Sequence, residues 1–270
     1  MRAGRSESSE AAWFVSSVEK AFLILRAFEA HERSLSLTEI AEITQLDKSS
    51  VQRFTYTLAA LGYLHKDKDA RRYTISPKIM SLGMIYLRTD PIVVRARHVL
   101  YELNKSLEVT SNLAELDGTD VIYVVRFPSR KTVTVDVVLG MRRPAFCMAS
   151  GRAILATRSD DEVRDILERS NRVAYTAHTK TDISEIMDEI HKTRARGYAL
   201  TEQETVMGDI SVAAPVRRPD GTCTAAINFS VSTADWDAER AVKQFSPVVI
   251  EAARAVSGTS ELRPFTFGDN

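Results

Sequence analysis

Residues 47–76 read DKSSVQRFTYTLAALGYLHKDKDARRYTIS and predict a helix followed by a hairpin. Asp47 can cap a helix by accepting hydrogen bonds from its first amides, and Gly62 suits the position just past its end. The inward face has apolar residues at three- and four-residue spacing: Val51, Phe54, Leu58 and Leu61. Two short strand-like runs, 63–65 and 73–75, then flank a charged turn. This order predicts a winged helix-turn-helix.

Two more helices are expected upstream, as such a domain needs for its core. Ser36 and Glu39 have the spacing of a capping box, in which each residue accepts a hydrogen bond from the backbone of the other. The apolar residues of this helix are Leu37, Ile40, Ala41 and Ile43. An earlier helix has an amphipathic stripe that we expect to pack inward, formed by Val15, Val18, Phe22, Leu25 and Phe28.

The helix and hairpin have a local excess of positive charge. Lys48 to Lys78 contain seven lysines and arginines but two aspartates, a net charge of +5, in a chain whose 36 basic and 36 acidic residues cancel. A local basic patch suits phosphate contacts, whereas polar side chains on a helix can reach base edges. We expect major-groove contacts from Ser49, Ser50, Gln52 and Arg53, and contacts to phosphates or the minor groove from Lys48, Tyr56, Arg71 and Arg72. The alternative is a protein-docking module with a solvated charged face.

The whole chain has the composition of a soluble globular protein of one or two domains. It has 270 residues, 44% hydrophobic and 27% charged. No run approaches the roughly 18 apolar residues of a membrane span, and the first residues lack an apolar signal core, so we expect a cytoplasmic protein without membrane contact. Two cysteines are too few for a disulfide framework, and no metal or cofactor is expected.

Five segments are expected along the chain. Ser76-Pro77 and Asp90-Pro91 are each typical of a helix start. The inner stripe after Asp90 is expected to contain Val94, His98 or Val99, Tyr101 or Glu102, Leu103 and Leu107. The predicted segments are a disordered lead (1–12), the winged helix-turn-helix (13–76), a helical linker (77–90), a second domain (91–258) and a loose tail (259–270).

The second domain mixes strands and helices. Strands are expected at 112–116 and 121–127 around a hairpin turn, and further strands at 133–139, 210–216 and 224–230. Helices are expected near Ser150 and at 159–168, 182–196 and 234–256, the third ending at Gly197. The pattern predicts an α+β fold of the PAS- or GAF-like kind, with helices on an antiparallel sheet.

The chain resembles the IclR family of bacterial transcriptional regulators over roughly residues 14–256. The matching segments, in order, are VEKA (18–21), SLTEIAEITQLDKSSVQRFTYTLAALGYL (36–64), RYTI (72–75), LDG (116–118), VIYV (121–124), GMRRP (140–144), ASGRA (149–153), GYA (197–199), VAAPV (212–216) and AAIN (225–228). This resemblance implies winged-helix dimers, often dimers of dimers. It also implies a C-terminal domain that binds a small metabolite and alters the repression or activation of a catabolic operon.

A ligand pocket is expected around residues 146–151. Small residues there allow a ligand close to the backbone, and the amides of a helix start favour an anion, which suggests a carboxylate. The resemblance places effector contacts at Arg143, Ala149, Ser150, Asp209, Ser211, Asn228 and Ser230. Phe146, Met148 and Val135 would form or adjoin the apolar wall. The expected effector is a small organic acid, with an aromatic acid or its degradation intermediate preferred.

Arg143 and Asp209 depart from the family pattern. Many relatives have an apolar residue before the proline at 144, where this chain has Arg143, and Asp209 stands at a position in the pocket wall. Arg143 could pair with a ligand carboxylate or point to solvent. Asp209 could accept a hydrogen bond from a ligand hydroxyl, pair with Arg143 or cap a turn.

Two other function classes have weaker support. An enzyme would need a nucleophile beside a base, but GxSxG, HExxH and a phosphate-binding glycine loop are all missing, and Cys147 and His178 are the main cues. A redox or metal sensor could use Cys147 and Cys223, although their apolar surroundings favour buried packing. A winged-helix regulator that senses a neutral ligand is a further alternative.

Overall fold

The computed structural model describes residues 13–29, 33–67, 69–129 and 137–258, which form two compact units divided between Tyr86 and Leu87. The predicted lead, the predicted tail and Val135 lie outside the described residues. Most of the predicted strand 133–139 does too, and its described part, 137–139, forms no strand. Among the described helices, none combines the length and the apolar character needed to cross a bilayer.

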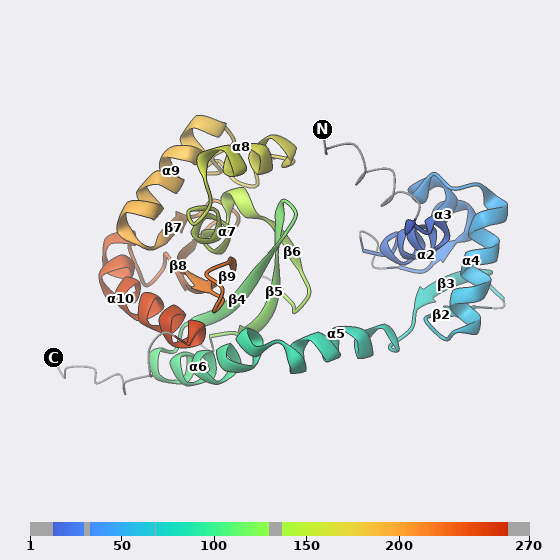
Figure 1. The fold of residues 1–270 in the computed structure, drawn as a ribbon, viewed down its shortest axis with the longest axis horizontal. Helices are drawn as coiled ribbons and strands as arrows, with labels where there is room; N and C mark the ends of the chain where they lie inside the picture. The colour runs from blue at the N-terminus through green and yellow to red at the C-terminus, as the bar shows by residue number, and fades with distance from the viewer. Residues whose placement is uncertain (1–12, 30–32, 68, 130–136, 259–270) are drawn as a thin grey trace, which may run out of the picture. The chain divides into compact units, whose positions relative to one another are not determined.

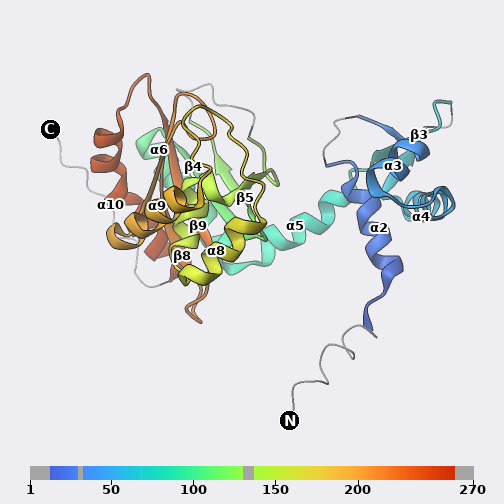
Figure 2. The ribbon, with the colours of Figure 1, turned by 90° about the horizontal axis from the view of Figure 1, so that it is seen from above.

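The N-terminal unit is the predicted winged helix-turn-helix (Figures 1 and 2). Its elements are α2 (Ser16–Arg26), β1 (Leu35–Ser36), α3 (Leu37–Thr44), α4 (Lys48–Ala60), β2 (Leu64–Lys66) and β3 (Arg72–Ile75). The helix α5 (Ile79–Thr89) spans the division between the two units. The strands form a three-stranded sheet in the order β1-β3-β2. The strand β1 was not predicted, because two residues are too few to show an alternating pattern.

The predicted starts of α3 and α4 are confirmed, whereas α5 begins at Ile79, two residues after the predicted Pro77. The Ser36 hydroxyl accepts from the Glu39 amide at 3.3 Å, and the Glu39 carboxylate accepts from the Ser36 amide at 2.8 Å. Asp47 accepts from the Ser50 amide at 2.8 Å and so caps α4. After α4, Gly62 has φ +80°, in the left-handed region that glycine tolerates best.

The inward stripe predicted for α2 is confirmed only at its end, where Leu25 and Phe28 pack against the core. Val15, Val18 and Phe22 are 57%, 53% and 57% exposed, whereas Ile24 and Ala27 are buried. Periodicity identified apolar residues on this helix, but it did not tell which of them α3 and α4 cover. An uncovered apolar face therefore remains on α2.

The inward faces of α4 and of α6 (Pro91–Leu107) also needed correction. Leu61 is exposed, whereas Thr55 is buried because its hydroxyl can donate to the Val51 carbonyl at 2.7 Å. In α6, Val94 and Tyr101 are exposed. The residues that α6 buries are Ile92, Val93, Ala96, Val99, Leu100 and Leu103.

The C-terminal unit is built on a six-stranded antiparallel sheet. Its strands are β4 (Thr110–Asp117), β5 (Asp120–Phe127), β6 (Arg142–Pro144), β7 (Ala199–Glu202), β8 (Asp209–Arg217) and β9 (Cys223–Ser232), in the order β6-β5-β4-β9-β8-β7. Its other helices are a 3-10 turn (Ala145–Cys147), α7 (Ala149–Leu155), α8 (Asp160–Arg169), α9 (Ile183–Arg196) and α10 (Ala238–Ser257). The prediction missed β6 and treated it as a loop.

Helices cover both faces of this sheet (Figure 1). One face packs on α6 and α10, and the other packs on α7, behind which lie α8 and α9. Alternation along the strands decides which side chain meets which layer. In β8, Val212 packs toward α6 and α10, whereas Ala213 packs toward α7.

A β-bulge between β4 and β5 changes this alternation. Leu113 pairs with Val125 but Ala114 pairs with Tyr123, so Val124 is the extra residue. Without the bulge, positions 123 and 126 would face opposite sides of the sheet. With it, Tyr123 and Arg126 both face the α7 side.

The start of α7 packs tightly against the backbone of the 3-10 turn at Gly151. No other described glycine approaches a backbone atom as closely. A Cβ atom on Gly151 would overlap the carbonyl oxygen of Ala145. Only glycine fits there without moving the backbone.

We expect Gly151→Ala to lower the free energy of unfolding by about 3 kcal/mol, at the upper end of overpacking costs, because backbone must move to relieve the overlap. Urea unfolding followed by circular dichroism measures this loss. Gly83→Ala in α5 is the matched control, since no atom lies within 4 Å of its added Cβ. An equal or smaller loss in Gly151→Ala than in the control would contradict the packing argument.

Candidate functional site

The exposed face of α4 and the wing, which is the hairpin of β2 and β3, border an open cavity of about 580 Å³. Four of the residues predicted to contact DNA line it: Ser49, Gln52, Arg53 and Tyr56. Leu37, Thr57, Lys66 and Tyr73 complete the lining. Lys66 was not among the predicted contacts, although it was counted in the basic patch. Its ammonium lies 5.8 Å from the centre of the Tyr73 ring.

The other four predicted residues lie outside this lining. Lys48 is exposed in the first turn of α4, and Arg71 is exposed between the wing strands with φ +52°. Ser50 is half-buried and donates its amide to Asp47. Hydrogen bonds from Ser49 and Ser50 hold the pKa of the Asp47 carboxyl well below its usual range.

Arg72 is bound within its own domain. Its Nη2 lies 2.7 Å from Glu39 Oε2 and donates to the Ser34 carbonyl at 2.6 Å, while Nε donates to the Ser34 hydroxyl at 2.9 Å. These contacts fix strand β3 to the start of α3. The geometry therefore favours a structural role for Arg72 over the predicted contact with DNA.

The C-terminal unit contains a cavity of about 220 Å³ on the α7 side of the sheet. Five residues predicted to contact the effector line it: Arg143, Met148, Asp209, Ser211 and Ser230. The other lining residues are Thr110, Asn112, Tyr123, Arg126, Val137, Thr205, Val206, Met207, Gly208, Val231 and Ser232. The lining residues therefore come from five strands, β4, β5, β6, β8 and β9, and from the loops between elements.

The remaining four predicted residues are buried and do not line the cavity. Phe146 and Ala149 belong to the hydrophobic core around α7. Ser150 and Asn228 are each 1% exposed. Within the described part of the chain, Ser150 Oγ and Asn228 Oδ1 have no hydrogen-bond partner.

One side of the cavity is a chain of hydrogen bonds that ends at an acid. The Asp209 carboxylate accepts from Ser211 Oγ at 2.9 Å, Ser211 and Ser230 hydroxyls lie 2.6 Å apart, and Asn228 Nδ2 donates to Ser230 Oγ at 3.2 Å. Burial raises the pKa of Asp209 to about 6, against the opposing effects of Ser211 and Arg126. A hydroxyl donor placed here would stabilise the ionised carboxylate.

Two guanidinium groups also reach this cavity. Arg126 donates from Nη1 to Asn112 Oδ1 at 2.9 Å. Arg143 is half-buried and donates to the Arg142 carbonyl at 3.4 Å. In the described structure no ion pair joins Arg143 to Asp209, so the side chain of Arg143 is a donor that a bound anion can use.

The prediction missed Tyr123 and Arg126 because strict alternation would separate them, and a bulge cannot be located from the sequence alone. It missed the residues of the 205–208 loop because an irregular loop has no periodicity. The hairpin signal at 117–120 did place β5 correctly. The presence of Arg126 near the end of that strand was therefore the available cue to a charged group in the cavity.

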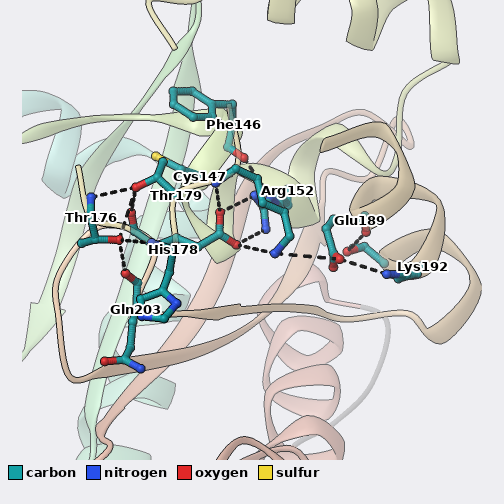
Figure 3. Close-up of polar contacts among 12 residues, drawn as sticks. Phe146, Cys147, Arg152, Thr176, His178, Thr179, Glu189, Lys192 and Gln203 are labelled. Carbon is teal, nitrogen blue, oxygen red and sulfur yellow. Dashed lines mark hydrogen bonds and ion pairs between the residues drawn. The ribbon is translucent and has the colours of Figure 1, made fainter. Parts of the chain in front are cut away.

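A buried ion pair between Arg152 and Glu204 fixes the start of the 205–208 loop beside α7 (Figure 3). Arg152 and Glu204 are 0% and 3% exposed, and two parallel hydrogen bonds of 2.5 and 2.7 Å join them. Arg152 Nε also donates to the Phe146 carbonyl at 2.8 Å. The Glu204 carboxylate accepts from the Lys180 amide at 3.2 Å, and the Thr179 hydroxyl donates to the Glu204 carbonyl at 2.5 Å.

Both cysteines are buried, and their environment disfavours thiolates. Burial raises the pKa of Cys147 to about 12 and also raises the pKa of Cys223. Three or more His, Cys, Asp or Glu side chains do not gather into a metal-binding group anywhere in the described residues. The geometry thus gives the redox or metal alternative no support.

Known protein families match both structural units. The model described as "IclR helix-turn-helix domain" matches residues 17–68, and "Bacterial transcriptional regulator IclR C-terminal" matches residues 84–258. The chain belongs to the IclR family. IclR proteins are transcriptional regulators and not enzymes, so the enzyme alternative is wrong.

Individual IclR relatives span nearly the whole chain. The Pca regulon regulatory protein of Pseudomonas putida is 30% identical over 89% of this chain and 82% of its own length. The p-hydroxybenzoate hydroxylase transcriptional activator of Acinetobacter baylyi is 24% identical over 89% of this chain and 90% of its own. The crystal structure of the regulator from Alicyclobacillus acidocaldarius matches with a TM-score of 0.78 at 28% identity, covering 92% and 100% of the two chains. The shared fold confirms the predicted α+β architecture.

We expect Arg152→Met to lower the free energy of unfolding by about 3 kcal/mol, at the lower end of the cost of breaking a buried ion pair. The buried Glu204 carboxylate then keeps only the partly exposed Lys180 ammonium, 3.4 Å away, as an ion-pair partner. Chemical denaturation measures the change. The control is Arg169→Gln, which removes an exposed pair with Asp165 and should cost less than about 1 kcal/mol. Equal losses in the two variants would show that the buried pair contributes no more than a surface pair.

Proposed function

We propose that this IclR regulator binds operator DNA through α4 and the wing, and that a small carboxylate in the α7-side cavity controls this binding. The convergence of Arg126 and Arg143 on one cavity is the observation that supports the ligand class most directly. A guanidinium can bind a carboxylate through two parallel hydrogen bonds. The regulator would act in the cytoplasm, where operator DNA is found.

The other polar groups of the cavity suggest what else the ligand contains. Asp209 and the paired Ser211 and Ser230 hydroxyls can accept or donate hydrogen bonds, which suits a ligand hydroxyl. Tyr123, Val137 and Met148 add flat and apolar surface between the polar groups. A hydroxylated aromatic acid, or an intermediate of its degradation, meets these requirements.

The relatives support the same chemistry and a catabolic operon as the target. One is named for the Pca regulon and another for p-hydroxybenzoate hydroxylase. Each name describes the relative that carries it. The cavity of this chain has the polar groups that a hydroxylated aromatic acid would need. The ligand would change DNA binding by favouring one of two protein states, as any effector with unequal affinities does.

On the DNA side, we assign base contacts to the middle of α4 and phosphate contacts to its start and to the wing. Gln52 and Arg53 share one exposed concave surface, and Arg71 projects from the wing. A second copy of this chain would give two such surfaces for two half-sites. The uncovered apolar face of α2, with Val15, Val18 and Phe22, suits the contact between copies.

We expect Gln52→Ala and Arg53→Ala to relax sequence preference, each with a loss of about 1–3 kcal/mol on the preferred site. Arg71→Ala should instead weaken all sequences and reduce the slope of log affinity against log salt by about one. Fluorescence anisotropy with operator and scrambled DNA at several salt concentrations distinguishes the two patterns. Arg164→Ala, an exposed change in the other unit, is the control. The reverse pattern would reject the assignment.

We expect one series of carboxylates to raise the melting temperature, since a ligand at about 100 times its dissociation constant adds about 2.7 kcal/mol. Arg143→Gln should weaken binding at least about tenfold, because a charge-assisted hydrogen bond is lost. Arg142→Gln is the matched control, because that neighbour pairs with Asp117 and Asp120 instead.

The outcomes of this screen separate the alternatives. Equal affinity of wild type and Arg143→Gln for an active acid would refute the role of Arg143. If only neutral compounds raise the melting temperature, the neutral-ligand alternative replaces the carboxylate.

A further inference from the structure

A second cavity in the C-terminal unit is lined by three arginines, by apolar and small residues and by one serine. Its volume is about 410 Å³, and it lies where the end of α9, the end of β8 and the last turns of α10 meet. Its lining consists of Arg196, Gly197, Ala214, Pro215, Arg217, Ile250, Ala253, Arg254 and Ser257. Three arginines from three elements therefore converge on a space whose lining contains no acidic residue.

Arg196 is held in place but keeps an unused donor. Its Nε donates to the Tyr198 carbonyl at 2.7 Å, and its guanidinium carbon lies 4.6 Å from the centre of the Tyr198 ring. Its Nη2 is buried and has no hydrogen-bond partner within the described residues. A buried donor without a partner is costly, so an acceptor from outside the chain would relieve that cost.

The other two arginines provide further positive charge. Arg217 donates to the Gly221 carbonyl at 3.4 Å, and Arg254 pairs with Glu251 at 2.6 Å. Across the described chain, no carboxylate lies within 4 Å of Arg196 or Arg217, so neither charge is neutralised by an ion pair. The backbone of Arg217 is fixed because its amide donates to the Ser257 hydroxyl at 2.9 Å.

We propose that this cavity binds a small organic phosphate. A phosphate has about two negative charges and several strong acceptor oxygens, which matches two guanidinium groups without ion pairs better than a monocarboxylate does. The apolar side chains of Pro215 and Ile250 leave a surface for the organic part of the ligand.

The two cavities are separate. Asp209 begins β8 at the effector pocket and Arg217 ends it at the arginine cavity, eight residues later. At about 3.3 Å per residue, the strand places them roughly 26 Å apart. A phosphate bound at Arg217 therefore cannot touch the groups that would hold the carboxylate.

Inorganic phosphate tests the proposal with the full chain. We expect a saturable rise in melting temperature when phosphate replaces chloride at constant ionic strength. Arg196→Gln and Arg217→Gln should each raise the apparent dissociation constant at least about tenfold. Arg143→Gln in the effector pocket and Arg164→Gln on the surface of α8 should leave it unchanged. Arg217 is exposed, so its variant remains informative if Arg196→Gln fails to fold.

Three results would overturn the proposal. The first is the absence of a saturable shift in the wild type. The second is an equal loss in Arg143→Gln, which would place phosphate in the effector pocket. The third is a loss of operator affinity in Arg217→Gln with unchanged phosphate binding, which would assign this arginine to the DNA backbone.

Discussion

The ion pair between Arg152 and Glu204 is the contact on which the C-terminal unit depends most. Both side chains are buried, and charges removed from water in this way stabilise a fold only when their geometry is good and their remaining donors and acceptors are used. Here Arg152 also holds the turn before α7, and Glu204 also holds the segment around Lys180. Because residues 205–209 follow Glu204 directly and line the cavity, the position of this wall is set by a contact outside the cavity.

The cavity shows how a sheet can gather charge on one of its faces. The bulge at Val124 turns Arg126 to the same side as Tyr123, and the pairing of β8 with β9 places the Ser211 and Ser230 hydroxyls within 2.6 Å. The strands thus fix these polar groups on the α7 side, and their other face packs on α6 and α10. Polar groups that are fixed in this way need little reordering before they can meet a ligand.

Local chemistry was predictable where neighbouring residues decide the structure. The caps at Ser36 and Asp47 were found because a helix start needs acceptors within three residues. The stripe of α2 was wrong at Val15, Val18 and Phe22, because periodicity does not tell which apolar residues of a helix are covered. Arg126 and Glu204 were missed because their roles arise from a bulge and from a partner 52 positions away, and neither leaves a pattern in the sequence. Five of the nine predicted effector residues line the cavity, since the family motif fixes strand positions but not the depth of each side chain.

The outer strands of the six-stranded sheet limit how copies of this chain can assemble. Its two ends are β6 and β7, which have three and four residues, and β6 ends at Pro144, which has no amide to donate. A strand from another chain would gain few backbone hydrogen bonds there. Continuous sheets between copies, and the fibrous aggregates that grow from them, are therefore disfavoured. Contacts between copies of this unit are therefore favoured through side chains on helices and loops, where sequence can set the number of copies.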